Sequence, residues 1–248
     1  MLPGGVLPAS LAYEALLSEL GDGVHAVAKE LEVYGGERPP PGFTLDVEVA
    51  GILQCAEEAG FGRFHLVGYS AGGASSLAFA AAHPDRLKSL ALLEPAWAGK
   101  EDLSPEEEAV WADFRLIAEL PPDEMMPAFI GKQLRPGVEA PPPPPGPPPP
   151  WMSSRPAGLK AFINAFASGE LDVKALRGFE QPVYFALGGL SNPDYYEDMA
   201  DRLAGIFSDF TLEVFEDRHH FDPPHRIEPK RLATSLRALW LRAESPAS

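Results

Sequence analysis

Gly68, Ser70 and Gly72 form the pattern Gly-x-Ser-x-Gly, which sets a serine hydroxyl between two residues that have no side chain. An apolar run at 64–67 precedes the pattern, and a stretch of small residues at 71–82 follows it. This context predicts a strand, a sharp turn and a helix, with the Ser70 hydroxyl at the positive end of the helix. Such a serine could act as a nucleophile. The alternative is a glycine-rich strand–helix loop that packs tightly or binds an anion.

With this turn, or elbow, the chain resembles the α/β-hydrolase superfamily. The resemblance rests on the elbow, the order of strands and helices, a helical segment after the next strand and a late histidine. It implies that Ser70 is acylated, that a late histidine is its base and that a carboxylate orients the histidine. A dehalogenase or epoxide hydrolase is disfavoured, because families of that kind carry aspartate at the position of Ser70.

Six histidines are available as the base. His220 is favoured because it follows the expected strand 210–215, where the resemblance places the base, and because His220-Phe221 matches a histidine–apolar step of the family. His219 is the alternative base and His225 a third choice. A neutral imidazole would take the serine proton and return it to the leaving group. The other interpretation of the histidine pair is a surface feature without a role, and a metal site is weaker still because neighbouring side chains diverge.

The carboxylate is where the sequence departs from the family pattern. The expected position after strand 183–187 falls near Ser191 or Asn192, and neither can carry the charge. Asp194 is close but displaced toward the next helix. Some members of the superfamily place the acid after the strand that follows the elbow, and here that residue is Glu94. We favour Glu94, with Asp194 as the alternative acid. The alternative interpretation of Glu94 is a strand-end residue that bonds loop amides.

Two backbone N–H groups should stabilise a tetrahedral oxyanion. Ala71, directly after the serine, is the first expected donor. By resemblance, Gly5 or Val6 is the second, although Pro3 stands where the family often has histidine. An ordinary glycine turn is the alternative.

The elements that must position these residues follow from hydrophobic periodicity and from Gly and Pro stops. We predict an α/β fold: a mostly parallel, doubly wound sheet of α/β-hydrolase type with an inserted helical cap. The core is expected at 1–96 and 180–248, the cap at 97–179 and a polyproline linker at 141–150, for which a signalling ligand is the alternative. Expected strands are 24–33, 64–67, 87–93, 183–187 and 210–215. Expected helices are 7–20, 45–59, 71–82, 105–120, 122–134, 156–167, 194–206 and 227–242.

The expected oxyanion loop begins at residue 3, so the strand that feeds it in the family is nearly absent. In that fold the strand lies between those at 24–33 and 64–67. We therefore expect the N-terminal strands of the sheet to be missing, through a late start, a truncated gene model or a natural degenerate form.

Composition narrows the classes of function. The 248 residues are 45% hydrophobic and 23% charged, which is typical of a globular chain, and the formal net charge of −16 disfavours nucleic acid and anionic membrane partners. Cys55 is alone, so neither an internal disulfide nor a cysteine-rich metal site is expected. The sequence has neither a long apolar run nor a signal-peptide pattern, which favours a cytoplasmic location.

The favoured function is a serine esterase or related hydrolase. It would act on a small ester or other acyl substrate through an acyl-enzyme, with no cofactor and no metal. Acyl transfer and C–C hydrolysis stay open, as does the oligomeric state. The alternative is a non-catalytic binding protein on the same fold, favoured by the absent aspartate at 191–192, by Pro3 and by the late start.

Overall fold

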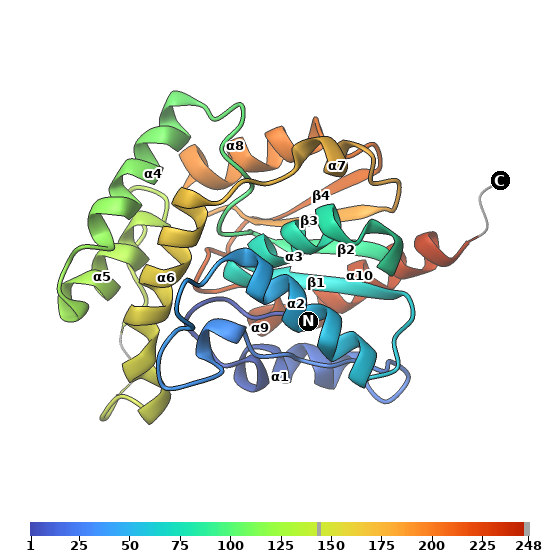
Figure 1. Ribbon diagram of the computed structural model, residues 1–248, viewed down its shortest axis with the longest axis horizontal. Helices are drawn as coiled ribbons and strands as arrows, with labels where there is room; N and C mark the ends of the chain where they lie inside the picture. The colour runs from blue at the N-terminus through green and yellow to red at the C-terminus, as the bar shows by residue number, and fades with distance from the viewer. Residues whose placement is uncertain (143–144, 246–248) are drawn as a thin grey trace.

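The computed structural model describes residues 1–142 and 145–245. Four parallel strands form one sheet in the order β1-β2-β3-β4 (Figure 1). They are β1 (Phe64–Tyr69), β2 (Leu87–Leu93), β3 (Val183–Gly188) and β4 (Phe210–Phe215). Helices flank the sheet, so the predicted α/β fold is confirmed.

Each face of the sheet has its own apolar core, because successive side chains of a strand point to opposite faces. On β2, Leu90 and Leu92 join one core, while Ala91 and Leu93 join the other. Helices α2 (Leu45–Glu58), α3 (Ala71–Ala82), α7 (Val173–Arg177) and α8 (Pro193–Ala204) contribute to the first core. Helices α1 (Ala9–Leu20) and α10 (Pro229–Glu244) contribute to the second. The short helix α9 (Pro224–Ile227) packs against α1 and α10.

Three helices between β2 and β3 lie together beside the sheet (Figure 1). These are α4 (Pro105–Ile117), α5 (Pro122–Lys132) and α6 (Arg155–Ser168), which we call the helical insert. Ser104 and Glu107 form a capping box that starts α4. Glu107 also forms a buried ion pair with Arg202 of α8, at 2.9 Å, which ties the insert to the sheet layer.

The predicted strand 24–33 is wrong. Residues 24–31 form no strand, and Glu32–Tyr34 is a short 3-10 helix (η1). A strand needs a neighbour along its length. Among residues 1–142 and 145–245, this segment pairs its backbone with a distant residue only at Met1: the Met1 amine donates to Val27 O at 2.7 Å, and Lys29 N donates to Met1 O at 2.9 Å.

The ends of the other predicted helices and strands lie within about three residues of the observed ends. Several short helices, which are too short to show a periodic pattern, were not predicted. Unpredicted are η1, α7, α9 and the 3-10 helices η2 (Pro84–Arg86) and η3 (Pro150–Ser154). The predicted linker 141–150 includes 143–144, which lie outside the described residues. Its described residues before Pro150 belong to no helix or strand.

Within residues 1–142 and 145–245, no helix has the length and apolar character needed to cross a membrane.

Candidate active site

Ser70 sits on a strained turn between β1 and α3. Its φ of 52° and ψ of −118° lie where residues with side chains are rare. A Cβ at Gly68 would collide with the Gly72 carbonyl, and a Cβ at Gly72 would collide with the Pro3 carbonyl. Both glycines are therefore needed for this tight approach of strand, helix and N-terminal loop.

The structure brings Ser70, His220 and Glu94 together, from three parts of the chain. His220 lies in the loop after β4, and its side chain is 1% exposed. Its Nε2 atom lies 3.0 Å from Ser70 Oγ, and its Nδ1 atom lies 3.1 Å from Glu94 Oε2. These are hydrogen-bond distances between a hydroxyl, an imidazole and a carboxylate in series.

Glu94 follows directly after β2 and is held in one orientation. Its φ of 45° is strained, and its Oε1 atom accepts from Gly188 N at 2.8 Å. Because one oxygen is used by this backbone donor, the other faces His220. An ionised Glu94 only accepts, so the proton of a neutral imidazole would lie on Nδ1 and leave Nε2 to accept from Ser70.

Aromatic side chains enclose the imidazole of His220, and the sequence did not predict these aromatic neighbours. Tyr196 of α8 stacks on it, with ring centroids 4.9 Å apart and planes at 16°. Tyr69 donates its hydroxyl to the carbonyl of His220. Burial raises the pKa of both tyrosines well above the usual value, so their hydroxyls stay protonated. The position of Tyr69 directly before Ser70 could have identified it from the sequence. No sequence feature marks Tyr196.

The alternative acid, Asp194, occupies a different place. It lies in the first turn of α8, and its backbone N–H donates to Asn192 Oδ1 at 3.1 Å. Among the hydrogen bonds of the described residues, none joins its carboxylate to His220. Asn192 itself donates to Lys132 O at 2.9 Å, so this loop contacts the helical insert.

Among the hydrogen bonds of the described residues, none joins Ser70 to either of the two other late histidines. His219 Nδ1 accepts from Phe221 N at 3.2 Å, and burial lowers the pKa of His219. His225 is fully buried, with its ring 5.0 Å from that of Tyr13 and 4.7 Å from that of Tyr69. Burial lowers the pKa of His225 to about 3, so this imidazole is neutral near pH 7.

The expected oxyanion donors divide into two groups. Gly5 and Ala71 line the same cavity as Ser70, whereas Val6 does not. Within the described residues, no acceptor is recorded for the N–H of Gly5 or of Ala71. The Tyr34 hydroxyl donates to Gly5 O at 2.7 Å, which fixes the plane of the Gly5–Val6 peptide bond in this loop.

The cavity above Ser70 is narrow and apolar. Its volume is about 20 Å³, enough for about one water molecule, so a larger ligand requires side chains of the insert to move. Most of its walls come from the helical insert: Trp111, Phe114, Phe129, Leu159, Phe162, Ile163 and Phe166. Gln133 supplies a polar group.

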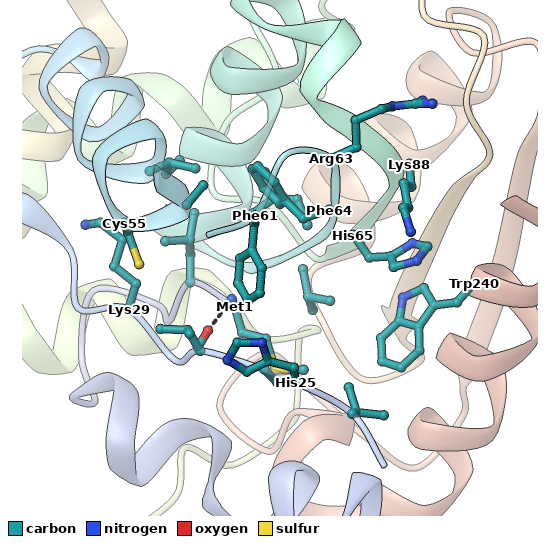
Figure 2. A pocket seen from close by; sticks show the side chains of 18 residues that line it. Met1, His25, Lys29, Cys55, Phe61, Arg63, Phe64, His65, Lys88 and Trp240 are labelled. Atoms are coloured by element: carbon teal, nitrogen blue, oxygen red, sulfur yellow. Dashed lines mark hydrogen bonds between the residues drawn. The ribbon is translucent and has the colours of Figure 1, made fainter. Parts of the chain in front are cut away.

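A second cavity, of about 240 Å³, lies at the outer edge of β1 and shares no lining residue with the first (Figure 2). His25, Phe61 and Trp240 are among its walls. Its Lys88 pairs with Glu244 at 2.8 Å. Across the described parts of the chain, no group of three or more His, Cys, Asp or Glu could hold a metal ion.

Solved structures share this fold. An esterase from Thermogutta terrifontis, solved with malate bound, matches with a TM-score of 0.69 and 19% identity over 98% of this chain and 89% of its own. The 2-hydroxy-6-oxo-6-phenylhexa-2,4-dienoate hydrolase of a Rhodococcus species matches with a TM-score of 0.63 and 17% identity over 97% of this chain and 89% of its own.

Sequence comparison gives a closer relationship. The 2-hydroxy-6-oxo-2,4-heptadienoate hydrolase of Pseudomonas putida is 28% identical over 183 residues, which are 66% of this chain. The match spans 62% of the length of that relative. A family model described as the alpha/beta hydrolase family matches residues 1–234. The chain therefore belongs to the alpha/beta hydrolase family.

Proposed function

We propose that the protein is a serine hydrolase that cleaves a small ester or other acyl substrate through an acyl-enzyme. One observation carries the proposal: Ser70 Oγ lies 3.0 Å from His220 Nε2, while Nδ1 of the same ring lies 3.1 Å from Glu94. The strained, glycine-flanked position of Ser70 supports it.

In this mechanism Ser70 Oγ attacks the substrate carbonyl while its proton passes to His220 Nε2. The resulting oxyanion accepts from the N–H groups of Ala71 and Gly5. When the tetrahedral intermediate collapses, His220 gives the proton to the leaving oxygen, and the acyl group stays on Ser70. Water then attacks the ester with His220 again as base, which frees the acid and restores Ser70. Glu94 orients His220 and stabilises the imidazolium.

The helical insert would act as the cap of this site and select the substrate. Its apolar walls favour an apolar part near the reacting carbonyl, and its side chains must separate before a substrate larger than water can enter. The sequence range 97–179 is our proposed extent of this cap.

Hydrolysis of a C–C bond next to a carbonyl is a second candidate, favoured by the name of the Pseudomonas putida relative. There the leaving group is a carbon that takes the proton. A comparison of kcat/KM for an activated ester and for a vinylogous 1,5-diketo acid distinguishes the two reactions.

A fluorophosphonate probe tests the nucleophile, because it reacts with activated serines and leaves them phosphonylated. We expect the full chain to be labelled at Ser70. The Ser70→Ala variant should not be labelled, and His220→Ala should be labelled at least about 100-fold more slowly, since the base is lost.

The matched control is Ser75→Ala, which removes a buried hydroxyl of α3 that donates to Ala71 O, outside the proposed triad. It should be labelled as the unaltered chain is. A folded protein that takes no label, shown by a cooperative thermal transition, would contradict the enzyme and favour a non-catalytic binding protein.

A further inference from the structure

The cavity at the outer edge of β1, which we call the edge slot, has the walls of an empty strand position (Figure 2). One wall is the edge of β1 at residues 64–67, and another is the segment 24–27. Side chains of α2 and α10 are among the remaining walls: Ile52, Ala56 and Trp240. The volume of about 240 Å³ compares with about 20 Å³ above Ser70.

The first two residues of the chain occupy one end of the edge slot as a parallel strand would. Leu2 forms a parallel bridge with β1: its N–H donates to Val67 O at 2.8 Å, and its carbonyl accepts from Tyr69 N at 3.0 Å. Met1 turns the other way and bonds to the backbone of residues 27–29. Consecutive residues that bond to opposite neighbours are typical of a strand inside a parallel sheet.

The edge of β1 stays open beyond this bridge. Among the described residues, Leu2 is the one that pairs with β1 on its outer side, so residues 64–66 have no strand partner there. Alternate residues of a strand turn their backbone groups to the same neighbour, so those of His65 face the edge slot, as the Val67 carbonyl does. An open edge of this kind is a template for pairing with another strand.

The charges around the edge slot favour a negative group on the ligand. In the described part of the chain, no Asp or Glu lines it, although the formal net charge is −16. Its positive groups are the Met1 amine, Lys29, Arg63 and Lys88. Each lysine pairs with a glutamate outside the lining. A protonated amine has three N–H donors, and the recorded bond to Val27 O uses one of them, so the Met1 amine can also donate to a carboxylate.

We propose that the edge slot binds an extended apolar peptide, which adds a strand parallel to β1 and places its free carboxyl end at the Met1 amine. The direction follows from the Leu2 bridge, because a parallel strand in line with Met1 ends at that amine. Successive side chains would point alternately toward α2 and toward Trp240. Main-chain hydrogen bonds would supply affinity, and the apolar walls would favour apolar side chains.

The inference is independent of the proposed function, because the edge slot and the Ser70 cavity share no lining residue. Failure of either leaves the other standing. Fluorophosphonate labelling tests the serine, while peptide binding can be followed without catalysis.

Cys55 reports directly on occupancy. It is the single cysteine of the chain and lines the edge slot, so its rate of alkylation by iodoacetamide has no background from other thiols. The probe is acetyl-Glu-Val-Ile-Val with a free carboxyl end, whose β-branched residues favour a strand. At ten times its Kd the peptide should slow alkylation about 10-fold, because the free fraction falls by that factor, and it should raise the Tm of the full chain.

Two changes to the peptide test the strand pairing while the protein stays unaltered. Methylation of the isoleucine nitrogen removes a main-chain donor and keeps every side chain, so we expect Kd to rise at least about 10-fold. An amide at the carboxyl end should also bind more weakly, because it lacks the charge. Equal protection of Cys55 by the methylated peptide, or by decanoate, would overturn the proposal in favour of a pocket for apolar acids. A peptide that neither protects Cys55 nor raises the Tm would overturn it outright.

A matched pair of protein variants tests the location. Ala56→Leu adds bulk to a lining residue of α2 that is 4% exposed, and it should raise Kd at least about 10-fold because the side chain fills space that the peptide needs. Ala50→Leu makes the same change on the exposed side of α2 and should bind the peptide as the unaltered chain does. Equal binding by two folded variants would contradict the proposed location. If Ala56→Leu shows no cooperative thermal transition, the comparison of peptides decides alone.

Discussion

At the scale of single residues, Glu94 has the geometry of a carboxylate that orients a catalytic histidine. It is 4% exposed, bonded to Gly188 N through one oxygen and to His220 through the other. Its strand, β2, pairs directly with β1, the strand that precedes Ser70, with Tyr69 opposite Leu93. Ser70 and Glu94 are therefore each the residue that follows one member of this pair.

Replacing the charge tests this assignment. Glu94→Gln keeps the shape but loses the negative charge that stabilises the imidazolium, so we expect kcat on an activated ester to fall at least about 100-fold. Asp194→Asn should change kcat by less than about twofold, because Asp194 has no recorded bond to His220. Steady-state kinetics of both variants provide the check. If neither loses more than a few-fold, the triad is wrong.

The sequence alone left both acids open for a physical reason. Each lies within a few residues of the carboxyl end of a parallel strand, where side chains from distant parts of the chain converge. The difference arises from the turn after each strand: Glu94 adopts a positive φ, while Asp194 continues into α8. Backbone angles of this kind have no periodic signal in the sequence.

At the scale of elements, amphipathic spacing and capping residues sufficed for the long helices and for the buried strands. Residues 24–33 were misassigned because strand formation depends on a neighbour, not on the segment itself. The helical insert was predicted, but the contact of Gln133 with Tyr196 at 2.7 Å was not, since it joins positions 63 residues apart.

The buried pair of Glu107 and Arg202 should hold the insert against α8. The side chains are 1% and 10% exposed, so removing Arg202 leaves a carboxylate uncompensated in the interior. We expect Arg202→Met to lower the free energy of unfolding by about 3–5 kcal/mol. Urea denaturation followed by circular dichroism gives the value.

The double change Glu107→Gln with Arg202→Met should restore much of this loss, because glutamine can keep the capping box without a charge. The pair Lys160–Glu119, whose side chains are 45% and 71% exposed, is the surface comparison. Its removal should change stability by no more than about 1 kcal/mol. If removing the buried pair and removing the exposed pair lowered the free energy of unfolding equally, Glu107 and Arg202 would not be what holds the insert against α8.

At the scale of the whole molecule, His225 should make folding sensitive to acid. Burial lowers the pKa of His225 to about 3 in the folded state, against about 6.5 when unfolded. Between these values the unfolded chain binds more protons, so stability rises with pH across this window and falls on acidification. From pH 6.5 to 5 the loss due to His225 is about 2 kcal/mol.

His225→Phe should therefore flatten the curve of unfolding free energy between pH 6.5 and 5, measured by urea denaturation at each pH. The Met1 amine, whose pKa burial lowers to about 6, also contributes to this curve, but equally in both proteins. An unchanged slope in the variant would show that His225 is not the group responsible.

In the proposed mechanism Glu94, which follows β2, orients His220, and no residue of the loop after β3 takes part in proton transfer. That loop instead fastens the insert: Asn192 N bonds to Gln133 O at 3.0 Å, and Arg135 N bonds to Leu190 O at 2.9 Å. The same loop also bonds the segment that leads to His220, because Gly189 N donates to Phe215 O at 2.9 Å and Leu190 N donates to Arg218 O at 2.9 Å. Substitutions at 189–192 should therefore change both the seating of the insert and the position of the His220 imidazole.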